Sequence, residues 1–215
     1  MAIRTNSYIK PDDMEYSVTI TNQKQKVKFI KRVENTIRAS MEYRDYIAYL
    51  KDYVDMNHCA FFTNMEKSQG SRIRIEIHHE PLTLFDIVET VLNKFIDEAI
   101  PINELFIADE VMELHYKNMV GLIPLSKSVH QVVHHGTDLV IPLSLVYGNY
   151  KEFLEVYEDY LEESVLDKIE RKINETKVIR QEMIDKLTPT YVYVEVDGFS
   201  LPKKVEVESR EKLSA

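Results

Sequence analysis

Two long stretches with helical periodicity restrict the fold of this chain more than any other feature. From about residue 22 to residue 55, apolar side chains recur at three- and four-residue steps, with one slip near Tyr43. From about residue 149 to residue 187, the same spacing predicts one long helix or two. Each of these helices needs cover for its apolar side. The two stretches could therefore pack on each other, or the second could form a dimer surface.

Shorter patterns between and beyond these stretches predict strands as well as helices. Residues 72–79 alternate strictly, with isoleucines on one face and Arg72, Arg74, Glu76 and His78 on the other. Strand patterns also occur at residues 16–21, at 120–125, and at 191–208, where Asp197-Gly198 predicts a hairpin turn. Further helices are predicted over about 84–98 with Thr83 or Asp86 as the cap, over 108–117, and from a Ser126 cap through His134. The predicted class is α+β.

Charge and cysteine content exclude some classes of protein. The net charge of −9 excludes a protein that coats nucleic acid through bulk charge. The segment Lys24–Lys51 nevertheless carries eight basic and three acidic residues, so this helix could lie along DNA or form a solvated face. The single cysteine, Cys59, excludes an internal disulfide and a four-cysteine zinc site. No apolar run approaches the roughly 18 residues that a membrane helix needs, and the first ten residues do not resemble a secretory signal. We therefore expect a cytoplasmic protein without membrane contact.

The histidines are concentrated in the middle of the chain, since all seven lie between residues 58 and 135. His78 and His79 are adjacent at the end of a predicted strand. His130 and His134 are four residues apart on a predicted helix, so both can bind one ion from the same helical face. A histidine from the strand would supply a third nitrogen. A single histidine, by contrast, is more often solvated or hydrogen-bonded.

The remaining histidines leave alternatives open. His58 precedes Cys59, and this pair could be a soft metal site, although a buried thiol is the simpler interpretation. His115 could be an extra ligand or a surface histidine, and we expect the surface position. His135 follows the helical pair without an assigned role.

The two histidine elements together resemble the HNH nucleases. The segment Glu76-Ile-His-His79 is followed by Pro81, and the segment Gly121–His134 ends in the His-x-x-x-His spacing. The cysteine-less variant found in colicin-type toxin nuclease domains is most similar. The resemblance covers about 25 positions, split by an insertion at residues 82–119. It implies a core of two strands and one helix, the ββα-metal module, built around one divalent ion, which could be Mg²⁺, Mn²⁺, Zn²⁺ or Ni²⁺.

The resemblance also implies a role for each matching residue. His78, His130 and His134 would bind the ion, and His79 would act as the general base that activates water. Adjacent strand residues point to opposite faces, which suits this division of roles between neighbours. Glu76 would orient a histidine and Arg72 would meet a phosphate, although both could equally form a surface ion pair.

Three features depart from the family pattern, one of them the long insertion at residues 82–119. The central Asn of the family, nine residues before the first helical histidine, is replaced here by Gly121. That Asn pins a loop by hydrogen bonding, and Asn118 could substitute for it. The cysteine pairs of common HNH proteins are also absent, as they are in the toxins.

We therefore expect an HNH-like ββα-metal module embedded among long helices, with small β elements at both termini. The expected segments are residues 1–71, 72–142 and 143–215. The expected function is DNA hydrolysis by an HNH-type endonuclease of bacteriophage style, located in the host cytoplasm. DNA would bind through Lys24–Lys51, and the long helices could bind a second copy or another protein. One alternative is a non-catalytic HNH-derived phage protein that binds or regulates a protein complex. Another is a helical interaction protein whose histidine cluster is incidental.

Overall fold

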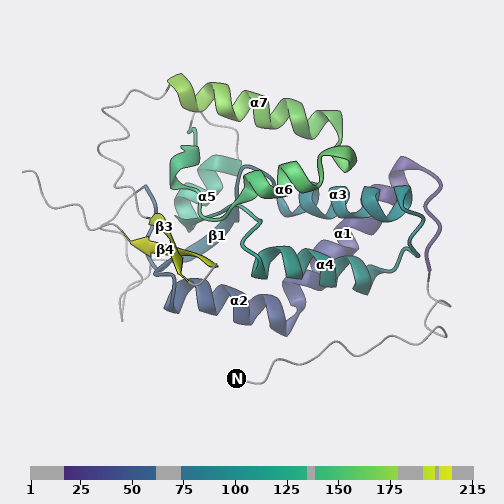
Figure 1. Ribbon diagram of the computed structural model, residues 1–215, viewed down its shortest axis with the longest axis horizontal. Coiled ribbons are helices and arrows are strands. Elements are labelled where there is room, and N and C mark those ends of the chain that lie inside the picture. The colour runs from purple at the N-terminus through teal and green to yellow at the C-terminus, as the bar shows by residue number, and fades with distance from the viewer. Residues whose placement is uncertain (1–16, 62–73, 135–138, 179–190, 197–198, 205–215) are drawn as a thin grey trace, which may run out of the picture.

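The computed structural model describes residues 17–61, 74–134, 139–178, 191–196 and 199–204. Seven α-helices and two small antiparallel sheets are formed within these ranges, which confirms the α+β class (Figure 1). The helices are α1 (Gln23–Ala39), α2 (Met41–Asp52), α3 (Leu84–Asp97), α4 (Glu104–Tyr116), α5 (Lys127–His134), α6 (Tyr150–Val156) and α7 (Glu163–Val178). The strands are β1 (Ile75–His79), β2 (Leu122–Ser126), β3 (Tyr191–Val196) and β4 (Phe199–Lys204). Short 3₁₀ turns occur at Leu143–Leu145 and Glu158–Tyr160.

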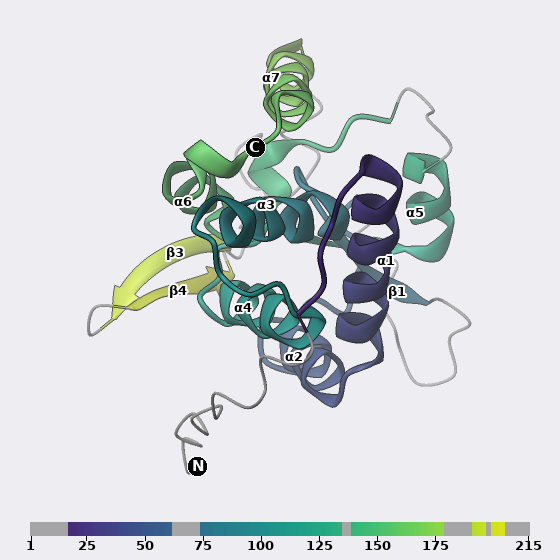
Figure 2. The ribbon, with the colours of Figure 1, turned by 90° about the vertical axis from the view of Figure 1, so that its right-hand side faces the viewer.

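Helices α1, α3 and α4 pack against one another and enclose most of the main hydrophobic core (Figure 2). Phe29, Ile30, Val33 and Ile37 form the buried stripe of α1, at the three- and four-residue spacing that the sequence displays. The same core continues into α7 through Val165. No helix among the described residues is both long and apolar enough to cross a membrane.

The first periodic stretch is two helices, not one, because the chain breaks at Ser40. Ser40 adopts an extended conformation with ψ of 153°, and its hydroxyl accepts a hydrogen bond from the backbone N–H of Tyr43. Ser40 is therefore both the end of α1 and the N-cap of α2. The slip in periodicity near Tyr43 marks this break.

The second periodic stretch is interrupted as well. Helix α6 ends at Val156, a 3₁₀ turn follows, and α7 begins at Glu163. In this interruption Glu162 accepts a hydrogen bond from Lys26 of α1 at 2.6 Å, so the acidic stretch and the basic helix do meet. Residues 179–187 of the predicted helix lie outside the described residues.

The strand predictions have mixed outcomes. Residues 17–21 form no strand, so the predicted N-terminal edge strand is wrong. Val18 donates a backbone hydrogen bond to Ile102 at 2.8 Å, but no partner strand extends this contact into a ladder among the described residues. The C-terminal hairpin is confirmed, with β3 antiparallel to β4 and Tyr191 opposite Lys204.

The central sheet positions the histidines. Strands β1 and β2 are antiparallel, with Ile75 opposite Ser126 and His79 opposite Leu122. Helix α5 follows β2 directly and packs on both strands. A second, smaller core lies under this unit, and Cys59 is fully buried in it. Its buried members are Cys59, Ala60, Ile75, Ile123, Leu125, Val129, Ile141 and Leu145.

Candidate metal centre

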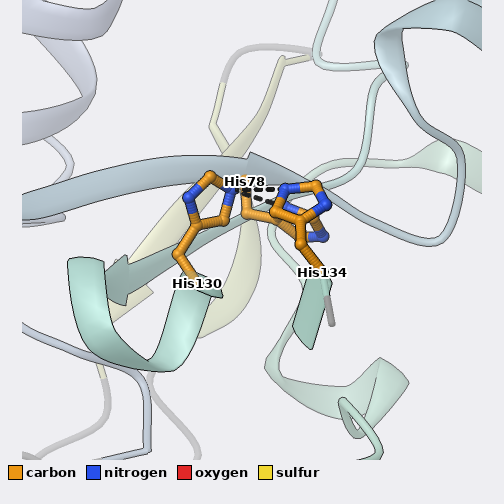
Figure 3. A group of neighbouring side chains, drawn as sticks. All are labelled: His78, His130 and His134. Carbon is orange, nitrogen blue, oxygen red and sulfur yellow. Dashed lines mark hydrogen bonds between the residues drawn. The ribbon is translucent and has the colours of Figure 1, made fainter. Parts of the chain in front are cut away.

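Three imidazoles meet between β1 and α5 (Figure 3). His78 comes from β1, while His130 and His134 come from successive turns of α5. The Nε2 atom of His130 lies 3.1 Å from Nδ1 of His78 and 3.0 Å from Nε2 of His134. One ligand atom from each residue lies within 4.8 Å of the other two. The scattered arrangement expected of an incidental cluster is therefore not observed.

Hydrogen bonds at the start of α5 hold this helix against β1, so that its histidines lie beside His78. The backbone N–H of Lys127, the first residue of α5, donates to the Arg74 carbonyl at 2.9 Å. Ser126 accepts a hydrogen bond from Val129 through its hydroxyl, which satisfies an amide in the first turn. Because residues at i and i+4 share a helical face, His130 and His134 then point toward the same end of β1.

Two of the three imidazoles also contact a carboxylate with their other nitrogen. Nδ1 of His130 lies 2.7 Å from Oε2 of Glu76. Nε2 of His78 lies 3.5 Å from Oε2 of Glu80. Such carboxylates fix the tautomer and orientation of histidines that bind metals. The expected orienting role of Glu76 thus has a specific partner, His130, whereas Glu80 is a residue that the sequence analysis missed.

The positions of the ring protons on His78 and His130 explain why this arrangement suits a cation. A carboxylate accepts hydrogen bonds, so the N–H of neutral His130 lies at Nδ1 and that of neutral His78 lies at Nε2. When both rings are in these neutral tautomers, the remaining nitrogens, 3.1 Å apart, would face each other as two lone pairs. A cation bound by both nitrogens would relieve this repulsion. Imidazole nitrogens about 2.1 Å from a shared ion are separated by roughly 3.0–3.4 Å, which agrees with the observed spacing.

Glu80 is a buried carboxylate whose charge is balanced locally. Burial alone would raise the pKa of Glu80, but the contacts with His78 and with Lys172 of α7 outweigh burial and lower the pKa. The Lys172 ammonium donates a hydrogen bond to the second oxygen of Glu80. Glu80 is therefore ionised at neutral pH and can accept a hydrogen bond from His78.

His79 lies apart from the triad contacts and is almost completely buried. Its ring stacks over Tyr43, and its Nε2 atom lies 3.0 Å from Nε2 of His115. Burial is the main reason that the pKa of His79 falls well below 6.5, and repulsion by Arg38, and by His115 when it is protonated, adds to the effect. His79 is neutral at physiological pH, which is the state that can accept a proton.

The expectation of a surface position for His115 is wrong, because this side chain is fully buried in α4. Its ring lies edge-on to Tyr43 and Tyr46, and its Nδ1 atom lies 2.7 Å from the Val111 carbonyl. The signal for burial was available in the sequence, since residue 115 is four positions after Val111 on the apolar side of the helix.

A small open cavity of about 100 Å³ lies beside the histidines. It is lined by Arg38, Ile77, His78, His79, Thr83, Leu84, His130 and His134. His79 and the triad thus face one space, although they contact different partners. Among the described residues that line the cavity, Arg38 of α1 is the one whose side chain is always charged. Thr83 and Leu84 begin α3, and the positive end of that helix dipole favours an anion.

Other predicted residues have different positions. Arg72 and His135 lie outside the described residues, and His58 is buried. At Gly121, a Cβ atom would lie 1.9 Å from the Glu80 carbonyl oxygen, so an Asn side chain does not fit there. Asn118 instead accepts a hydrogen bond from the Tyr147 hydroxyl at 2.8 Å, which ties the loop before β2 to the segment after Leu145.

Comparison with known proteins gives one family match. The model of the family described as bacteriophage G278-like virion protein matches residues 1–197. This range includes every element from α1 to β3, and therefore all residues of the histidine site. No curated protein and no solved structure matches the chain.

Proposed function

The chain belongs to the bacteriophage G278-like virion protein family, and we propose that it is a metal-dependent, HNH-type endonuclease that hydrolyses DNA phosphodiester bonds. The observation that carries the proposal is the triad with its two carboxylates, Glu76 on His130 and Glu80 on His78. A strand–strand–helix unit, β1, β2 and α5, presents this set, as the HNH resemblance implies.

The described residues fit one divalent ion bound by His78, His130 and His134. Three imidazoles suit Zn²⁺ or Ni²⁺, whereas Mg²⁺ prefers oxygen ligands. When bound, a divalent ion supplies charge stabilisation for the phosphate and for the leaving oxygen. Glu76 and Glu80 would hold two of the imidazoles in the tautomer whose free nitrogens can bind the ion.

His79 supplies the base, because its neutral imidazole lines the same cavity as the triad. It accepts a proton from water as the water oxygen forms a bond to phosphorus. The bond between phosphorus and O3′ then breaks, and the released O3′ takes a proton from solvent. A positioned base of this kind typically contributes a factor of roughly 10² to 10⁴ in rate.

Arg38 binds the phosphate in this proposal. Its guanidinium carries a permanent charge, lines the cavity, and can form paired hydrogen bonds with phosphate oxygens. Its intramolecular partner Glu34 is 3.8 Å away on the same helix, and half of the Arg38 side chain is exposed. Of the basic residues in Lys24–Lys51, the proposal therefore assigns the DNA contact at the site to Arg38. Lys26, in contrast, is held inside the molecule by Glu89 and Glu162.

Plasmid nicking tests the proposal directly. The protein is freed of metal by chelation, supplied with Mg²⁺, Mn²⁺, Zn²⁺ or Ni²⁺ in turn, and incubated with supercoiled DNA. We expect the wild-type protein to nick DNA with at least one ion. His79→Ala should lose nicking but still bind the ion, whereas His130→Ala should lose both nicking and ion binding. Absence of nicking with all four ions by folded protein would refute the endonuclease.

A second candidate is a non-catalytic phage protein that uses the same site to bind or regulate a protein complex. The match to a family described as virion proteins favours this candidate. Gly121 favours it as well, because it stands where the HNH nucleases have their central Asn. In that case the triad still binds an ion, His79→Ala does not affect ion binding, and no ion supports nicking.

A further inference from the structure

His115 is a buried histidine that the proposed reaction leaves without a role. It lies in the last turn of α4, fully buried between the rings of Tyr43 and Tyr46. Its two nitrogens contact two different groups: Nδ1 lies 2.7 Å from the Val111 carbonyl oxygen, and Nε2 lies 3.0 Å from Nε2 of His79. A buried imidazole held at both nitrogens has a fixed orientation.

These contacts determine where the protons lie. A carbonyl oxygen can only accept, so His115 donates to Val111 through Nδ1–H. Burial lowers the pKa of His115 to about 4, and the ring therefore carries a single proton at neutral pH. Its Nε2 atom is then an acceptor, and the contact at 3.0 Å requires the hydrogen to come from Nε2 of His79. The contact thus assigns the single ring proton of a neutral His79 to Nε2, and Nδ1 is then the nitrogen with a free lone pair.

We propose that His115 is a positioning residue that fixes Nε2 of His79 as the protonated nitrogen and leaves Nδ1 as the proton acceptor. The inference rests on the proposed function, in which His79 takes a proton from water. His79 lines the cavity and its Nε2 is occupied by His115, so Nδ1 is the nitrogen that remains for this transfer. His115 does not line the cavity itself and acts only through His79.

The first test is NMR of the metal-free protein, which needs no nuclease activity. With ¹⁵N-labelled histidine, we expect two ring N–H protons that exchange slowly with water, one on Nδ1 of His115 and one on Nε2 of His79. Both should vanish in His115→Phe, and both should persist in the control Tyr53→Phe, whose exposed ring lies at the end of α2. A proton on Nδ1 of His79 in the wild-type protein would overturn the inference.

The second test compares two substitutions in the nicking assay. His115→Phe fills a similar volume but offers no acceptor, whereas His115→Gln can place an amide oxygen near the position of Nε2. We expect kcat to fall roughly ten- to hundredfold in His115→Phe and to recover in large part in His115→Gln. Ion affinity and KM should stay unchanged in both variants, because neither the triad nor Arg38 is altered.

The outcomes separate this inference from the proposed function. If the wild-type protein nicks DNA and His115→Phe nicks it equally fast, the positioning role is wrong and the nuclease stands. If no ion supports nicking, the nuclease is wrong. The NMR result then decides alone whether His115 fixes the proton on His79.

Discussion

Glu76 links the exposed face of β1 to the histidine triad. Its carboxylate contacts Nδ1 of His130 at 2.7 Å on one side and the exposed guanidinium of Arg74 at 3.3 Å on the other. The carboxylate therefore orients His130 without being a ligand itself. Groups in this position commonly change metal affinity by a factor of about 10 to 100.

The substitution Glu76→Gln should accordingly weaken ion binding roughly ten- to hundredfold, because an amide accepts a weaker hydrogen bond from His130 than a carboxylate does. Isothermal titration of the metal-free protein with Zn²⁺ or Ni²⁺ measures the effect. Glu113→Gln is the matched control, since Glu113 is exposed, lies away from the histidine triad, and forms an ion pair with Lys117 on the same helix. Equal affinities in the two variants would contradict an orienting role for Glu76.

A second prediction concerns Arg38. In a His79→Ala background, where DNA should bind without being cut, Arg38→Ala should weaken DNA binding and reduce the slope of log K against log salt by about 1. Arg32→Ala is the control, because Arg32 lies on the same helix but pairs with Glu104 and does not line the cavity. Fluorescence anisotropy at several salt concentrations measures both slopes. If the two arginines have equal effects, the basic helix binds DNA diffusely or not at all.

At the scale of single elements, the close approach between the end of β1 and the start of β2 depends on Gly121. The backbone N–H of Glu80 donates to the Gly121 carbonyl at 3.0 Å, and a Cβ atom at residue 121 would meet the Glu80 carbonyl oxygen. The close approach of the two chain segments holds Glu80 beside His78. Glycine at residue 121 is therefore a packing requirement in this protein.

Gly121→Ala should destabilise the fold by roughly 1–3 kcal/mol, the usual cost of forcing atoms into a closely packed region. It should also weaken ion binding, because Glu80 must move. Urea unfolding and ion titration measure the two effects, with Ser128→Ala on the exposed side of α5 as the control. A stable Gly121→Ala protein with normal ion affinity would show that the segments separate easily.

How much of this structure the sequence predicts depends on the range of the interactions. The triad was predictable, because His130 and His134 need only helical spacing and His78 only a strand end. The start of α3 was also predictable, because it depends on residues close together in the sequence. Thr83 and Asp86 cap the helix reciprocally, so both proposed caps take part. The break at Ser40 was not predicted as a helix end, although the slip near Tyr43 marks it. The choice between one helix and two after residue 149 stayed open, because the apolar spacing continues past Val156 while the chain turns.

Contacts between distant segments account for the rest. Glu80 meets Lys172, which is 92 residues away, and His79 meets His115 across the insertion. No spacing rule predicts either pair, since each depends on how α4 and α7 pack against the sheet. The burial of His115 was in principle predictable from the face of α4, but its partner was not.

For the molecule as a whole, the histidine triad is connected to the main core. Helix α7 lies at one edge of the molecule in both views (Figures 1 and 2). Two of its lysines form ion pairs near the site: Lys172 with Glu80, and Lys168 with Asp86 at 2.5 Å. The site is also joined to α4 through His79 and the buried His115. Global stability should therefore depend on the protonation of residues in this region.

Buried His115 should make the protein less stable in mild acid. In the unfolded chain its pKa is about 6.5, whereas burial lowers the pKa to about 4 in the folded protein. Above pH 6.5 both states are neutral at this residue, so stability is unaffected. Between pH 6.5 and pH 4 only the unfolded state binds the proton, and the free energy of unfolding should fall by about 1 kcal/mol per pH unit. Below pH 4 both states are protonated, and this contribution stays constant.

Urea unfolding of the chelated protein at pH values between 7.5 and 4 tests this contribution against His115→Phe. The carboxylates and the remaining histidines titrate in both proteins, so the difference between the two stability curves isolates residue 115. We expect the wild-type curve to fall more steeply, by the uptake of about one proton, only inside the window from 6.5 to 4. Because phenylalanine has no titratable group, the two curves should run parallel above pH 6.5. Parallel curves throughout would mean that His115 takes up its proton in the folded state as easily as in the unfolded chain, and the buried pair with His79 would then be wrong.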